Sequence, residues 1–156
     1  MTALEKHFKK LNIDYNSIAF YDSNEFLKQE QKNNRFLELY ANYVNEKKYS
    51  IEYIERAKKE IPFIAKILNQ ELKKDGRLGA CIDISIVLSR ILEKEGYWNY
   101  LTKGSLTIDF PIESKIETKY FWSVDDGEFQ AGHTWVVAPP FNVIDIALRQ
   151  QPVSFP

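Results

Sequence analysis

The sequence predicts an α+β fold, in which a helical first half is followed by one more helix and an antiparallel sheet. All six glycines and all three tryptophans lie after residue 75. The first 75 residues are rich in Lys and Glu, a composition that favours helix. After residue 96, β-branched and aromatic runs alternate with turn residues, which is typical of strands. We therefore expect one domain over residues 1–156, with a mainly helical part (1–75) and a helix-plus-sheet part (76–156).

The composition excludes several classes of protein. A chain of 156 residues that is 44% hydrophobic and 14% aromatic can bury a core, so it is not a disordered chain. The net charge of −1 provides no general attraction to nucleic acid. A single cysteine excludes an intrachain disulfide. No apolar run has the length of a signal peptide or a membrane span, so we expect a cytoplasmic protein that binds neither membrane nor nucleic acid.

Helix start signals divide the first half of the chain. Asp22, with Glu25 three residues later, has the form of a capping box before an apolar face. Ser50 is a plausible N-cap of a second helix, in which apolar residues recur every three to four positions from Ile51 onward. Pro62 should kink that helix or start a new one.

The second half begins with a different kind of helix. Apolar residues cover nearly every side of the segment 81–95, which predicts a buried helix that ends at Gly96. Strand-like segments follow at 97–108, 119–124, 132–138 and 142–148, with a turn at 125–127.

One histidine and one aspartate stand out among these strands. Asp145 lies in the apolar run 143–148 and needs a partner, because an unpaired buried charge is costly. A hairpin that turns at Pro139–Pro140 makes His133 and Asp145 near cross-strand neighbours, with Cβ atoms about 5 Å apart. The spacing therefore predicts that the carboxylate orients the imidazole. His7, in a polar N-terminal stretch, is expected to be exposed.

Cys81 would occupy the first turn of the buried helix. The helix dipole and the backbone N–H groups there favour a thiolate, and the Cys81 N–H could donate to an oxyanion. With His133 as base and Asp145 as orienter, Cys81 would complete a nucleophilic triad. Taken alone, the residue types and their spacing favour structural roles, such as an inert core thiol or a strand histidine.

Three segments resemble the transglutaminase-like superfamily, whose fold is papain-like. GACIDISIVLSRILEKEG (79–96) is similar to its nucleophile helix, GHTWVV (132–137) to its histidine strand, and VID (143–145) to its aspartate strand. The resemblance covers about residues 76–150. It implies that Cys81 is the nucleophile, His133 the general base and acid, and Asp145 the orienter. The residues before Cys81 provide no obvious second oxyanion donor, the nearest amide being Gln70.

Members of this superfamily attack amides through a thioester, and differ in the acceptor. The chain is too short for an arylamine acetyltransferase, and the acidic stretch 125–128 lacks the ligand spacing of a calcium loop, so we expect no cofactor or metal. Hydrolysis of a peptide or side-chain amide in a protein or peptide substrate is the first expectation, and acyl transfer to an amine, as in a transglutaminase or deamidase, is the second. The remaining alternative is a catalytically silent domain that binds a protein partner through Trp98, Trp122, Trp135 and the neighbours of Trp98.

Overall fold

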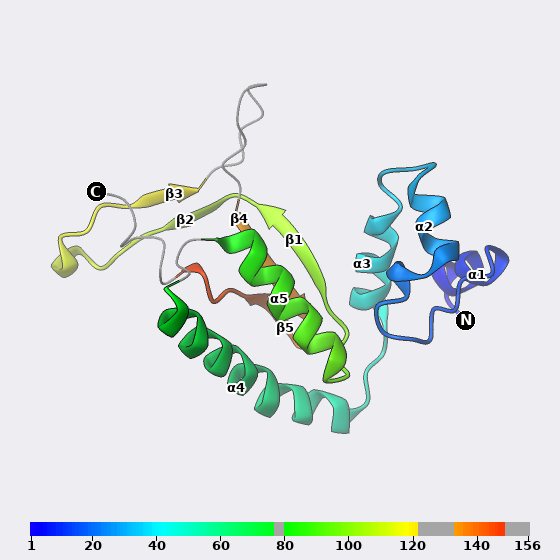
Figure 1. Cartoon of the computed structure of the whole chain (residues 1–156), viewed down its shortest axis with the longest axis horizontal. Coiled ribbons are helices and arrows are strands. Elements are labelled where there is room, and N and C mark those ends of the chain that lie inside the picture. The colour runs from blue at the N-terminus through cyan, green and yellow to red at the C-terminus, as the bar shows by residue number, and fades with distance from the viewer. Residues whose placement is uncertain (77–79, 122–132, 149–156) are drawn as a thin grey trace.

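The computed structural model describes residues 1–76, 80–121 and 133–148. Within them the chain is an α+β protein of helices and antiparallel strands (Figure 1). The helices are α1 (Ala3–Lys10), α2 (Asn24–Glu30), α3 (Leu37–Glu46), α4 (Ile51–Asp75) and α5 (Cys81–Lys94). The strands are β1 (Tyr100–Gly104), β2 (Leu106–Ile108), β3 (Lys119–Phe121), β4 (His133–Ala138) and β5 (Phe141–Ile144). Short 3₁₀ turns lie at Phe20–Asp22 and Ile112–Ser114.

Hydroxyl side chains cap three of the helices. Thr2 and Glu5 form a capping box at α1, and the Ser50 hydroxyl accepts from the Tyr53 N–H, so the predicted start of α4 is confirmed. The predicted capping box at Asp22 is wrong by one residue. Ser23 has the extended backbone of an N-cap and accepts from the Phe26 N–H, whereas Asp22 ends a 3₁₀ turn and pairs with Arg90.

Helix α4 runs for 25 residues and continues through Pro62. Pro62 neither ends the helix nor starts a new one, and α4 curves gently along the outside of α5 in Figure 1. Gly76, with φ +73°, provides the left-handed backbone that ends the helix.

The structure has two hydrophobic cores. The first lies among α1–α3 and includes Trp98; the second lies between α4, α5 and the sheet. Tyr53, near the start of α4, packs against both. The division between the cores therefore falls near residue 50, although the change in composition comes after residue 75. Helix α4 resembles the first half in sequence, but it packs with the second.

Two antiparallel ladders make up the sheet structure. One has the order β1-β4-β5, and the other pairs β2 with β3. The predicted strand 97–108 is divided, because residues 97–99 are buried without strand pairing and β1 ends at Gly104 before β2 begins. The strand predicted to run to residue 148 ends at Ile144. Residues 122–132 and 149–156, including the predicted turn 125–127, lie outside the described residues.

The prediction that α5 is buried on nearly every side is wrong. Leu88 and Leu92 are buried against the sheet, but Ile82, Ile86 and Val87 are 53%, 40% and 44% exposed. Helix α4 and the sheet cover only part of the α5 circumference. An apolar side chain is buried only where another element packs against it, so the remaining apolar residues of α5 stay exposed. The predicted end of α5 is confirmed, since Gly96 has φ +85° just beyond it.

Among the residues suggested for partner binding, those at 97–99 are not available on the surface, and Trp122 lies outside the described residues. Tyr97, Trp98 and Asn99 are buried, at 0%, 6% and 0% exposure. Trp98 packs against Phe20 and Tyr43 and lies beneath the Lys47 ammonium. These residues therefore join the two halves of the protein from within. His7 is exposed, as expected, and none of the described helices is long and apolar enough to cross a membrane.

Candidate functional site

His133 and Asp145 form a buried polar pair. The Nε2 atom of His133 is hydrogen-bonded to Oδ2 of Asp145, and the two side chains are only 1% and 6% exposed. A carboxylate bonded to Nε2 fixes the direction in which the imidazole ring points. Because Asp145 engages Nε2, the other ring nitrogen, Nδ1, is the one that would serve a nucleophile.

The second oxygen of Asp145 holds the backbone. Its Oδ1 accepts from the N–H groups of Ala147 and Leu148, both at 3.0 Å, in a turn that follows β5. The apolar pattern of residues 143–148 predicts that Asp145 lies inside a strand. In the structure β5 ends at Ile144, one residue earlier. The N–H groups after it donate to the Asp145 carboxylate instead of to a neighbouring strand.

The β-hairpin that brings the pair together is not in the predicted register. The chain turns at Pro139–Pro140, but Val136 pairs with Ile144, and the ladder is irregular between Val136 and Ala138. His133 and Asp145 are therefore not directly opposite, and their contact depends on the turn that carries Asp145.

Trp135 packs beside the imidazole. The rings of His133 and Trp135 are nearly parallel, with centroids 6.3 Å apart and planes 24° apart. Gly104 pairs with His133 on the neighbouring strand, and a Cβ atom there would lie 2.7 Å from the Trp135 ring. Gly104 therefore belongs to the site, and it was not among the residues predicted from the sequence. The available signal was a glycine within a strand-like run, which often marks a close approach.

Cys81 is the first residue of α5 and is partly buried. The residue before it, Ala80, makes no side-chain cap, in contrast to Thr2, Ser23 and Ser50 at the starts of α1, α2 and α4. No N-cap side chain therefore competes for the N–H groups of the first turn, which remain suited to an anion.

The start of α5 and the start of β4 lie at the same end of the sheet. The Ser85 hydroxyl, one helical turn after Cys81, donates to the carbonyl oxygen of Thr134 at 3.0 Å, and Thr134 follows His133. Figure 1 shows α5 running along the sheet from this end. The helix N-terminus is thereby held near the strand end that carries the imidazole.

The structure does not join Cys81 to the other two residues. Val136 belongs to the same buried core as Leu88 of α5. By strand alternation, the side chain of His133 is therefore directed to the opposite face of β4. Among the described residues, no hydrogen bond links Cys81 to His133 or Asp145. Gln70 is exposed on α4, and the second oxyanion donor stays unassigned. The site therefore contains a preformed His133–Asp145 pair. The Cys81 thiol lies near the start of the same strand, β4, but within the described ranges it is not bonded to the pair.

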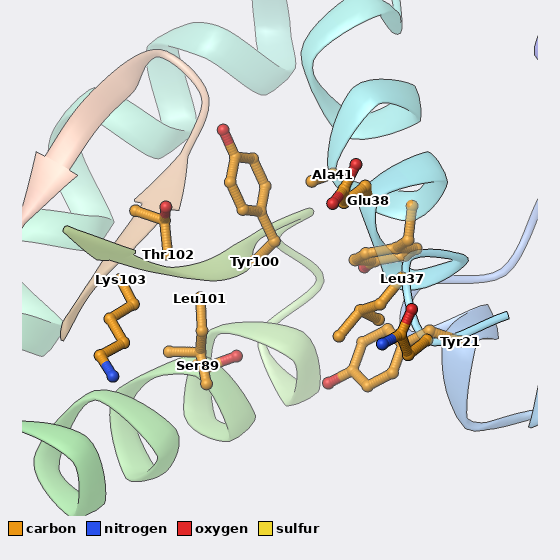
Figure 2. A pocket seen from close by; sticks show the side chains of 11 residues that line it. Tyr21, Leu37, Glu38, Ala41, Ser89, Tyr100, Leu101, Thr102 and Lys103 are labelled. Atoms are coloured by element: carbon orange, nitrogen blue, oxygen red, sulfur yellow. The ribbon is translucent and has the colours of Figure 1, made fainter. Parts of the chain in front are cut away.

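Two cavities bear on where a ligand would bind. One, of about 460 Å³, includes Asp145 and Trp135 in its wall. The other, of about 500 Å³, lies between α3, α5 and β1 and holds none of the three candidate residues (Figure 2). Several polar groups of the second cavity are already bonded within the protein: Tyr21 donates to Glu93, and Glu38 pairs with Arg35. We therefore place the candidate site at the first cavity.

No group of three His, Cys, Asp or Glu side chains suited to a metal ion occurs in the part of the chain that the structure describes. Comparison of the chain with protein-family models, with curated proteins and with solved structures finds no match.

Proposed function

We propose that this protein is a cysteine enzyme of the transglutaminase-like type, in which Cys81 acts with His133 and Asp145. The observation that carries the proposal is the buried bond from Asp145 to His133 Nε2. In a triad, a buried carboxylate holds the imidazole in the tautomer and orientation that serve the nucleophile. The uncapped N-terminus of α5 at Cys81, at the same end of the sheet, supports the assignment of the nucleophile.

The reaction follows from these three groups. His133 takes the thiol proton, and the Cys81 thiolate attacks the carbonyl carbon of an amide, forming a C–S bond. The C–N bond then breaks, and His133 gives its proton to the leaving amine. In the second step His133 takes a proton from water, whose oxygen attacks the thioester. The C–S bond breaks, the acid is released and the thiol is restored.

Hydrolysis of a peptide or side-chain amide is the proposed outcome, and transfer to an amine is the same chemistry with another acceptor. The two differ only in whether water or an amine enters the second step. The proposed substrate is a protein or peptide, and the proposed location is the cytoplasm, where a lone thiol stays reduced.

One observation favours a second candidate function. In the part of the chain that the structure describes, no hydrogen bond joins Cys81 to His133, and the imidazole is 1% exposed. A non-catalytic domain of the same fold, which binds a protein partner, would need no contact between them. The His133–Asp145 pair would then only hold the turn after β5.

Trapping of the thioester separates the two functions. The protein is mixed with a library of peptide amides and glutamine peptides, quenched in acid and weighed intact by mass spectrometry. We expect a mass increase that maps to Cys81 and is absent from Cys81→Ala. With a proteomic digest as a second substrate source, the absence of any adduct on Cys81 would contradict an acyl-enzyme mechanism.

A further inference from the structure

The cavity of about 460 Å³ adjoins the His133–Asp145 pair directly. Asp145 and Trp135 form part of its wall, and each also contacts His133. A ligand in this cavity would therefore lie against the two residues that fix the imidazole. Its volume falls within the range of small-ligand sites, about 300–1,000 Å³.

The wall is largely apolar where it is open to a ligand. Leu106, Ile108, Val143 and Leu148 line it together with the Trp135 ring. Val143 is 62% exposed. Its exposed surface is available to an apolar group.

The acidic groups of the cavity are already engaged. Asp145 is bonded to His133 and to two backbone N–H groups. Asp109 accepts from the Thr118 hydroxyl at 2.9 Å. The cavity therefore offers a ligand mainly hydrophobic contact, and a charged side chain would lose its hydration there without a new partner.

We propose that this cavity holds a branched or aromatic apolar side chain of the peptide substrate, beside the His133–Asp145 pair. The proposal rests on the proposed function. A peptide whose side chain is held there lies against the residues that orient the imidazole, so binding brings its backbone close to the catalytic histidine. The substrate class is thus a peptide that carries Leu, Ile or Phe as the bound side chain.

Ligand binding can be read without any reaction at Cys81. The probes are N-acetyl amino-acid methylamides of Leu, Phe, Asp and Lys, and the readout is the Trp135 indole N–H signal in ¹⁵N NMR, assigned with Trp135→Phe. We expect the Leu and Phe probes to shift this signal at concentrations at least about tenfold lower than the Asp and Lys probes. Val143→Asn should weaken binding of the Leu probe by about tenfold.

Ile112→Asn is the matched control, because Ile112 is 94% exposed and lies outside the cavity wall. It should bind the Leu probe as the wild type does. Equal binding of Leu and Asp probes, or no effect of Val143→Asn, would overturn the apolar subsite. If the Leu probe binds selectively while the reactivity of Cys81 is indifferent to His133, the subsite's selectivity stands and the proposed enzyme function fails.

Discussion

Asp145 uses one carboxylate oxygen to hold Nε2 of His133 and the other to hold the backbone that follows β5. The orientation of the imidazole and the shape of the turn therefore depend on the same side chain. This dual role explains why a carboxylate can be 6% exposed in an apolar stretch, since both of its oxygens are satisfied.

Replacing Asp145 by Asn should remove its function at the imidazole and leave its function at the backbone. An amide oxygen can still accept from the backbone N–H groups, but the charge that stabilises the imidazole is lost. We expect the free energy of unfolding to fall by about 1–3 kcal/mol, measured by urea denaturation. Asp83→Asn, at an exposed position of α5, should cost less than about 1 kcal/mol. Equal costs in the two variants would contradict the buried pair.

Gly104 should tolerate no side chain while Trp135 is present. Gly104→Ala places a Cβ atom 2.7 Å from the indole ring, so we expect a loss of about 1–3 kcal/mol in stability from overpacking. In a Trp135→Phe background the crowded ring atoms are absent, and the same substitution should cost clearly less. Thermal denaturation of the four proteins in this double-mutant cycle measures the coupling. Additive losses would show that the two residues do not press on each other.

Ser85 should position Cys81 through its bond to Thr134. Ser85→Ala removes a buried hydrogen bond of 3.0 Å and should cost about 1 kcal/mol of stability. We also expect slower alkylation of Cys81, because the first turn of α5 is no longer tied to β4. Ser89→Ala is the control: Ser89 is also buried, but it bonds to Asn99 at 2.6 Å, about one turn farther along α5 than Ser85. A similar loss of thiol reactivity in both variants would point to general loosening of α5.

Tyr97 should make the protein sensitive to alkali. Burial and a hydrogen bond to Glu60 raise the pKa of Tyr97 to about 12. Unfolding returns its pKa to about 10, so the unfolded chain binds fewer protons between these values and the free energy of unfolding falls as pH rises from 10 to 12. Tyr97→Phe should reduce this slope in urea titrations at pH 9 to 12. An unchanged slope would mean that Tyr97 ionises equally in both states.

Local chemistry predicted several of these features. The Ser50 cap, the glycine after α5 and the turn at Pro139–Pro140 each depend on one or two residues whose backbone preferences are strong. The composition of α4 resembles that of the first half, so the sequence predicted the boundary between the two parts after residue 75. Composition indicates that a segment forms a helix, but it does not indicate which core that helix packs against.

Features that depend on tertiary neighbours could not be predicted. Ile82 and Ile86 have the side chains of core residues, yet no element among the described residues covers them enough to bury them. Asp145 ends a strand because its carboxylate competes for the next N–H groups, which hydrophobic alternation does not reveal. Strand alternation correctly predicted that His133 and Trp135 share one face of β4. It could not predict which face of the sheet α5 covers.

If the His133–Asp145 pair activates Cys81, the rate of thiol alkylation must depend on that pair. The chain has one cysteine, so the rate of iodoacetamide modification reports Cys81 alone. We expect His133→Ala and Asp145→Asn each to slow the modification at neutral pH by at least about tenfold, because the imidazole that takes the thiol proton is lost or no longer oriented. Ile112→Asn, at an exposed position, should react as the wild type does. Equal rates in the wild type and His133→Ala would contradict activation of Cys81 by the pair.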